Sequence, residues 1–120
     1  MKDIGKGCIV NVASIAAKEP NENMAPYAVS KAGMICFSRV LAKEVAKDNI
    51  RVNSIAPALT QTELIEELSR EQFQKLLEKI PMGRIAYPEE IAELILFLSS
   101  ERSSYITGQC YNISGGRGEY

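Results

Sequence analysis

The stretch Gly7–Ser14, "GCIVNVAS", decides the fold. Its run from Cys8 to Val12 is apolar and rich in β-branched side chains, a pattern typical of a strand buried on both faces. Such a strand needs helices on both sides of its sheet. The rest of the chain should therefore supply helices and further strands.

Strands and helices alternate along the rest of the chain. Apolar residues recur at helical spacing after Tyr27, Pro57 closes a second apolar stretch, and Pro88 followed by two glutamates is a helix start signal. The predicted elements, in chain order, are a strand over residues 8–12, a helix over 27–47, a strand over 50–56, a helical stretch that begins at Thr62, a helix over 88–98 and a strand over 108–113.

This alternation is typical of parallel βαβ units with right-handed crossovers. We therefore predict an α/β fold in three layers. Ser14 lies just past the C-terminal end of the first strand, and Pro57–Thr62 lies just past the same end of the second. In open α/β sheets ligands bind at that edge, so these residues are candidates for a site.

The composition excludes several classes of protein. The 120 residues are 46% apolar and 24% charged, as in one globular domain, and 14 Lys and Arg nearly balance 15 Asp and Glu. The apolar runs fall short of the roughly 20 residues of a bilayer span, and the residues after Met1 lack the apolar segment of a secretory signal. We expect a cytoplasmic protein that binds neither nucleic acid nor membrane.

The three cysteines, Cys8, Cys36 and Cys110, lie far apart in a chain without histidine. Neither a disulfide framework nor a metal site is therefore indicated. We expect buried, reduced thiols that act as small apolar side chains.

Ser14, Tyr27 and Lys31 are the candidate catalytic residues. Tyr27 and Lys31 are four residues apart on the predicted helix and would face the same way. A phenol, with a pKa of about 10, exchanges protons poorly at neutral pH unless a cation stabilises the phenolate. With the Ser14 hydroxyl, the set suits proton transfer to a carbonyl oxygen. Structural roles remain open, since Tyr27 could pack on the Lys31 stem and Ser14 could cap a turn.

Four ordered motifs extend this pattern over nearly the whole chain: "GCIVNVAS", "YAVSKAG", "NIRVNSIAPALTQTE" and "IPMGRIAYPEEIAELILFLSSERSSYITGQCYNISGG". They resemble the C-terminal half of the short-chain dehydrogenase/reductase family, of the classical, 3-oxoacyl-carrier-protein reductase-like type. The resemblance implies a partial, doubly wound Rossmann-like parallel sheet and catalytic roles for Ser14, Tyr27 and Lys31. Tyr27 would be the general acid in ketone reduction or the base in alcohol oxidation, and Lys31 would also hold the nicotinamide ribose.

The segment after the second strand resembles the loop of this family that contacts the nicotinamide of NAD or NADP. Pro57, Ala58, Thr60 and Thr62 fall in this loop. Ala58 stands where this family usually has glycine. If the backbone there has a positive φ or lies close to the cofactor, alanine in place of glycine costs about 1 kcal/mol. The family carries a mobile lid between residues 59 and 82, where an apolar stripe either closes over substrate or packs on the sheet. The stripe consists of Leu64, Ile65, Leu68, Phe73, Leu76, Leu77 and Ile80.

The half of the family that binds the cofactor pyrophosphate has no counterpart in this sequence. Gly5 and Gly7 precede a strand, and Ser114–Gly118 follows the last strand with no helix behind it, so neither is a dinucleotide fingerprint. We expect residues 1–120 to be the catalytic half of a Rossmann-type domain that meets only the nicotinamide end of NAD or NADP. Whether Met1 is the native start stays open, as do the substrate and the direction of the reaction.

Two functions follow from this reading. The first is NAD(P)-dependent ketone reduction or alcohol oxidation of a small molecule, with the isolated chain inactive until the other half is supplied. The alternative is a non-catalytic fragment that acts by oligomerising with full-length relatives. Apolar residues around much of the helix that begins at Tyr27 suggest a subunit contact. By resemblance, we expect a homodimer, a homotetramer or a complex with the complementing half.

Overall fold

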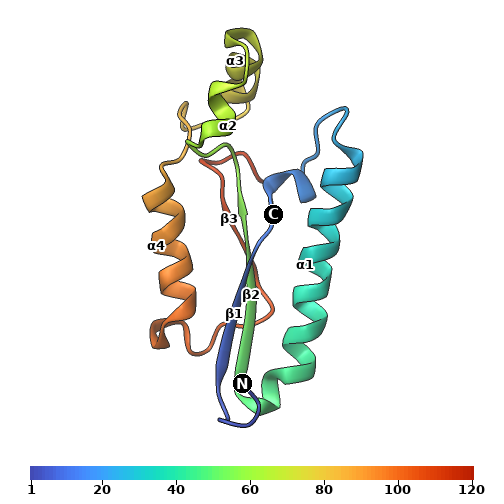
Figure 1. Cartoon of the computed structure of the whole chain (residues 1–120), viewed down its shortest axis with the longest axis vertical. Helices are drawn as coiled ribbons and strands as arrows, with labels where there is room; N and C mark the ends of the chain where they lie inside the picture. Colours follow the sequence, from blue (N-terminus) through green and yellow to red (C-terminus); the bar gives the residue numbers. More distant parts are fainter.

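The computed structural model, which describes residues 1–62 and 65–120, contains one parallel sheet of three strands. The strand order is β1-β2-β3, so β2 is central (Figure 1). In the register, Val12 of β1 lies opposite Ile55 of β2, and Pro57 of β2 lies opposite Ile113 of β3. The strands are β1 (Gly7–Val12), β2 (Ile50–Pro57) and β3 (Cys110–Ile113).

Two long helices cover the opposite faces of this sheet, which makes three layers (Figure 1). They are α1 (Ala25–Val45) and α4 (Pro88–Ser99). Two short helices, α2 (Glu63–Glu66) and α3 (Arg70–Glu78), lie beyond the carboxyl ends of the strands. The described residues also form three 3₁₀ turns, η1 (Ile15–Ala17), η2 (Ala46–Asp48) and η3 (Glu101–Ser103). The predicted α/β fold with three parallel strands is confirmed.

The core lies on β2, because this strand has a neighbour on each edge and a helix on each face. Val52, Ile55 and Ala56 have no exposed surface. On the α1 side Val52 packs with small and branched residues, Ala42 and Val45 of α1 and Ile50 of β2. The burial of such side chains provides most of the free energy of folding.

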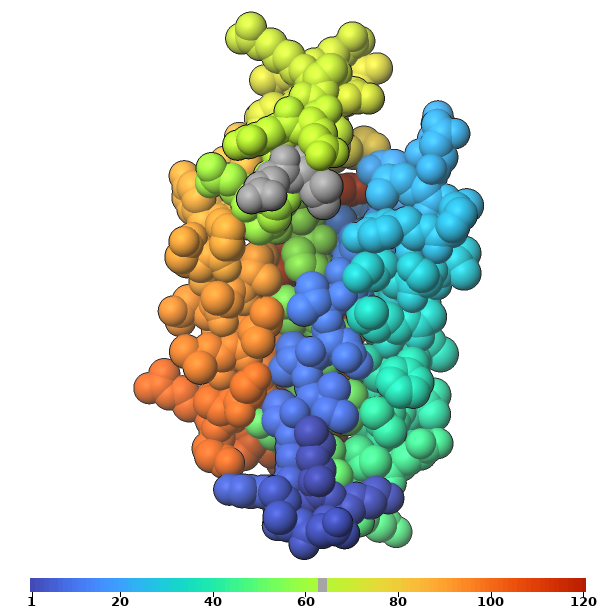
Figure 2. All heavy atoms as spheres, in the orientation of Figure 1, coloured from blue at the N-terminus to red at the C-terminus, as the bar shows by residue number. Residues whose placement is uncertain are grey.

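The edge strand β1 differs from the prediction of a strand buried on both faces. Its residues from Gly7 to Asn11 are half-buried, and Val12 is 44% exposed. In Figure 2 the atoms of β1 reach the surface between α1 and α4. The apolar run is that of an inner strand, but among the described residues only β2 pairs with it.

The helical stretch predicted from Thr62 contains two short helices, α2 and α3. Ser69 begins α3 with a capping box, in which the Ser69 hydroxyl accepts from the Gln72 N–H at 3.1 Å and the Gln72 side chain accepts from the Ser69 N–H at 3.0 Å. Ser69 and Gln72 have the spacing of a helix start signal, but they lie inside the apolar stripe, which by itself does not mark a helix start there. Leu64 of that stripe lies outside the described residues.

A buried polar contact joins β2 to the segment that leads into β3. Asn53 has no exposed surface, its amide donates to the Ile106 carbonyl at 2.9 Å, and its carbonyl accepts from the Gln109 N–H at 3.0 Å. Arg51 reaches the same segment and the end of α4, donating to the carbonyls of Leu98 and Ser100. Hydrogen bonds of this kind fix the path of the chain between α4 and β3.

The three cysteines are free thiols, as expected, but they are not all buried. Cys8 and Cys110 are half-buried, whereas Cys36 is exposed on α1. The prediction of a buried thiol is wrong for Cys36, because its position on the helix points away from the sheet.

Across the part of the chain that the structure describes, no helix has the length and apolar character to cross a membrane.

Candidate active site

Ser14 lies at the carboxyl end of β1, where the strand turns into η1. The Ala13 N–H still bonds to the Ile55 carbonyl at 2.9 Å, so the sheet ladder holds the chain up to the residue before Ser14. The Ser14 hydroxyl then caps η1 by accepting from the Ala16 N–H at 3.1 Å. The predicted capping role is thus present, and the hydroxyl hydrogen is left to donate to another group.

Tyr27 and Lys31 lie on successive turns at the start of α1. The Lys31 ammonium donates to the carbonyl of Val12 at 3.0 Å, which ties α1 to the end of β1 beside Ser14. The same nitrogen lies 5.8 Å from the centre of the Tyr27 ring, within the range of a cation–π contact. Tyr27 itself is 45% exposed. The helix therefore brings the phenol and the ammonium together, as their spacing predicts.

The segment after β2 is held by two neighbours. The Ala58 N–H bonds to the Ile113 carbonyl of β3 at 3.2 Å. Thr60 forms a parallel bridge with Ala86, flanked by a bond of 2.9 Å from the Ala86 N–H to the Leu59 carbonyl. Ala58 has no positive φ, so its methyl group costs no backbone strain at the position where the family usually has glycine.

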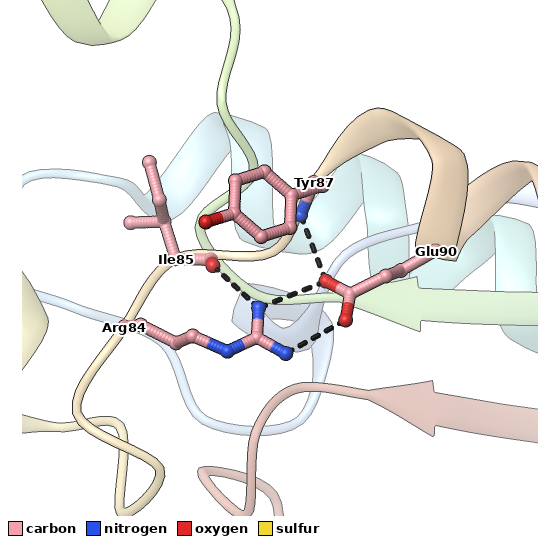
Figure 3. Close-up of polar contacts among 4 residues, drawn as sticks. All are labelled: Arg84, Ile85, Tyr87 and Glu90. Carbon is pink, nitrogen blue, oxygen red and sulfur yellow. Dashed lines mark hydrogen bonds and ion pairs between the residues drawn. The ribbon is translucent and has the colours of Figure 1, made fainter.

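The return segment that carries Ala86 is fixed by an ion pair (Figure 3). Arg84 donates to both carboxylate oxygens of Glu90, at 3.0 and 2.7 Å, and also to the Ile85 carbonyl at 3.1 Å. Glu90 accepts from the Tyr87 N–H at 2.9 Å, at the start of α4. The hydrogen bonds from Arg84 and from the Tyr87 backbone lower the pKa of Glu90 to about 2. This pair fixes the segment against which residues 59–61 pack.

Ser14, Tyr27 and the segment after β2 line one open hollow of about 360 Å³. It therefore brings together six of the seven predicted site residues. The seventh, Lys31, lies one helical turn away, behind Tyr27. The hollow is lined by Ser14, Ile15, Ala16, Asn21, Met24, Tyr27, Pro57, Ala58, Leu59, Thr60, Thr62, Ile65, Leu68, Leu76 and Arg117.

Comparisons with known proteins agree with this geometry. A family model described as enoyl-(acyl carrier protein) reductase matches residues 1–117. The chain is 46% identical over 110 residues to 3-oxoacyl-(acyl-carrier-protein) reductase of Thermotoga maritima, a match that covers 92% of this chain and 45% of that protein. The chain belongs to the short-chain dehydrogenase/reductase family. This is a family of oxidoreductases.

Two further members extend the comparison. The chain is 40% identical over 117 residues to 2-dehydro-3-deoxy-L-rhamnonate dehydrogenase (NAD(+)) of a Sphingomonas species, covering 98% of this chain and 47% of that protein. It is 36% identical, with a TM-score of 0.87, to a crystal structure of 3-ketoacyl-(acyl-carrier-protein) reductase from Brucella melitensis complexed with NADH, covering 97% of this chain and 48% of that one. The chain thus spans about half the length of the short-chain dehydrogenases/reductases that it matches.

The residues expected to meet the nicotinamide end of a cofactor line this hollow, apart from Lys31. The lining includes Thr60 and Thr62 beside Pro57, and the Thr60 hydroxyl donates to the Ala58 carbonyl at 3.3 Å. The glycines that follow β3 lie against apolar side chains. A side-chain carbon at Gly115 would lie 2.6 Å from Ile80, and one at Gly116 would lie 3.1 Å from Pro81.

The apolar stripe has two environments. Ile65, Leu68 and Leu76 line the hollow, as a cover over substrate requires, whereas Ile80 is buried with 4% of its surface exposed. Apart from the stripe, six lining residues were not among the predicted site residues: Ile15, Ala16, Asn21, Met24, Leu59 and Arg117. Asn21 and Met24 lie in the loop between Ser14 and Tyr27, and that position is the signal that could have found them. Among the described residues, no cluster suited to a metal ion occurs.

Proposed function

We propose that this chain is the catalytic half of an NAD(P)-dependent oxidoreductase that interconverts a ketone and an alcohol. The observation that carries the proposal is the hollow at the carboxyl ends of the strands, because Ser14, Tyr27 and the 57–62 segment all line it. Family membership supports the same chemistry, since the matched relatives are named as reductases and a dehydrogenase. The proposed catalytic residues are Ser14, Tyr27 and Lys31.

Each of the three residues has a separate role in the proton transfer. The Ser14 hydroxyl donates a hydrogen bond to the carbonyl oxygen of the substrate and so orients it. The Tyr27 phenol gives a proton to that oxygen during reduction and takes it back during oxidation. Lys31, whose ammonium is 5.8 Å from the Tyr27 ring centre, places a positive charge beside the phenol during the transfer.

The cofactor is NAD or NADP, which supplies or accepts the hydride when bound. Pro57, Ala58, Thr60 and Thr62 would lie along its nicotinamide end, and the Thr62 hydroxyl would bond to the carboxamide. Lys31 would hold the ribose hydroxyls. The relative complexed with NADH supports a nicotinamide cofactor for this chain. We further propose that residues 1–120 require a dinucleotide-binding half, in the same polypeptide or in a partner, to bind the pyrophosphate.

The substrate is a small carbonyl compound or the corresponding alcohol. The matched relatives act on an acyl-carrier-protein thioester in one case and on a sugar acid in another, by their names. We therefore take only the reaction type from them.

A second candidate function rests on the outer face of α1. Val29, Phe37 and Val40 are 71%, 59% and 50% exposed, which is much apolar surface for one helix face. In this alternative the chain is not catalytic and acts by oligomerising, as a dimer or tetramer, with full-length relatives. Mixing it with such a relative would then change the assembly without adding a working site.

Tyr27→Phe is the variant that tests the catalytic proposal. The assay follows NADH or NADPH oxidation with a small ketone, using this chain co-expressed with the amino-terminal half of a relative. Loss of the phenolic proton should lower kcat by about 100-fold or more, with little change in the dissociation constant for the cofactor. Tyr105→Phe is the matched control, since Tyr105 is fully exposed and should leave kcat unchanged. Equal activity of the two variants would remove Tyr27 from the mechanism.

A further inference from the structure

Arg117 brings a positive charge to the candidate active site. It follows β3 and its side chain is half-buried. Among the described residues that line the hollow, it is the one with a charged side chain. The remaining lining is apolar apart from hydroxyls and one amide, so a cation there is a feature that selects ligands.

Two neutral acceptors hold the Arg117 guanidinium in place. Its Nη2 donates to the Glu19 carbonyl at 3.1 Å and to the Asn21 side-chain oxygen at 3.2 Å. These are the hydrogen bonds of its side chain within the described residues. A guanidinium has five N–H donors, so those on Nη1 and Nε are left for a ligand.

A second cation, Lys79, meets Arg117 at Asn21. The Lys79 ammonium, at the end of α3, donates to the same Asn21 oxygen that Arg117 uses. Two positive groups that share one neutral acceptor repel each other, and the repulsion falls when an anion joins them.

No carboxylate of the described residues pairs with either cation. The ion pairs there join Lys2 to Asp48, Lys75 to Glu71 and Arg84 to Glu90. Glu19, whose backbone carbonyl accepts from Arg117, uses its carboxylate to accept from the backbone N–H of Glu119 at 3.2 Å. The charge of Arg117 is therefore not neutralised by the protein.

We propose that Arg117, assisted by Lys79, binds the carboxylate of the substrate, which makes the substrate a small oxo acid or hydroxy acid. The inference rests on the proposed function and narrows its substrate class. A hollow of about 360 Å³ holds a compound a few carbons long, with its carbonyl oxygen at Ser14 and Tyr27 and its carboxylate at Arg117. Neutral ketones and esters would lack the second contact.

The test compares acetoacetate with its uncharged methyl ester, methyl acetoacetate. Binding of both to the 120-residue chain is measured by NMR titration, and kcat/KM is measured for both in the assembly with a dinucleotide-binding half. The variants are Arg117→Met, which removes the charge, Arg117→Lys, which keeps it, and Lys79→Met. Arg102→Met, an exposed arginine outside the hollow, is the control.

We expect Arg117→Met to weaken acetoacetate binding by about tenfold or more, the usual effect of a lost charge-assisted hydrogen bond. Methyl acetoacetate and the Arg102→Met control should be unaffected. Arg117→Lys should retain much of the preference for the acid, and Lys79→Met, at an exposed position, should weaken acetoacetate binding by a smaller factor without affecting the fold.

Three results would overturn the proposal: acetoacetate bound no better than its ester, binding that Arg117→Met and Lys79→Met leave unchanged, or binding of inorganic phosphate alone. Turnover of ketones with no effect of Arg117→Met would leave the proposed function intact. Arg117-dependent binding of acetoacetate without any turnover would support the carboxylate site and contradict the catalytic proposal.

Discussion

Replacement of Asn53 by alanine tests whether a buried amide determines the path of the chain from α4 into β3. The change removes the donor to the Ile106 carbonyl and the acceptor for the Gln109 N–H, at 2.9 and 3.0 Å. Because Asn53 has no exposed surface, water cannot readily take over the hydrogen bonds of the lost side chain. We expect a loss of stability that far exceeds that of a surface substitution.

The size of this loss follows from the groups left behind. The Ile106 carbonyl keeps a long contact of 3.4 Å from Arg51, whereas the Gln109 N–H loses its acceptor. An unsatisfied buried polar group costs about 1–3 kcal/mol, and the space left by the amide adds about 1 kcal/mol. Since Gln109 is near the surface and water reaches it in part, we expect a free energy of unfolding lower by about 2–3 kcal/mol.

Urea denaturation of the chain measures this quantity. The free energy of unfolding falls by about 1.5 kcal/mol per molar urea. The urea midpoint of Asn53→Ala should therefore lie about 1.5 M below that of the wild type. Gln109→Ala is the control, because it keeps the N–H that bonds to Asn53 and removes only an exposed side chain, and it should change stability by about 0.5 kcal/mol or less. A midpoint for Asn53→Ala equal to that of the control would refute the reasoning.

Two further predictions concern the segments around the hollow. The pKa of Glu90 is lowered from its ordinary 4.5 to about 2, so its pairing stabilises the fold above pH 4.5 and the contribution is lost as the pH falls toward 2. The stability difference between wild type and Glu90→Gln, measured by urea titration at a series of pH values, should therefore shrink over that range, and a difference that stays constant would contradict the ion pair. Gly115→Ala and Gly5→Ala both place a methyl group at positive φ, but only the first meets a neighbour, Ile80 at 2.6 Å. Gly115→Ala should therefore lower the thermal midpoint more, and equal midpoints would exclude that contact.

Much of the fold could be predicted from the sequence because the signals are local. The apolar run after Gly7, the helical spacing after Tyr27 and the proline at residue 88 each indicate an element whose limits the structure places within a few residues of the prediction. Ser69 is different, because its capping box begins a separate helix inside a stretch that the apolar spacing predicts only as helical.

The candidate site could be predicted in part. Ser14, Tyr27 and the segment from Pro57 to Thr62 follow strand ends or begin a helix, so their position at one edge of the sheet follows from topology. Arg117 could not be found in this way. It reaches the hollow because the chain after β3 returns to the end of η1, where Lys18 donates to the Tyr120 carbonyl at 2.6 Å. Contacts between residues this far apart in the chain leave no periodic signal in the sequence.

Deuterium transfer tests the central claim most directly. The assembly of this chain with a dinucleotide-binding half is given NADH or NADPH that carries deuterium at the transferable position of the nicotinamide, together with a small oxo acid. Mass spectrometry of the hydroxy acid product then reports the label. The account predicts one deuterium on the carbinol carbon with the wild-type chain and no product above background with Tyr27→Phe. Unlabelled product, or labelled product formed equally well by Tyr27→Phe, would contradict it.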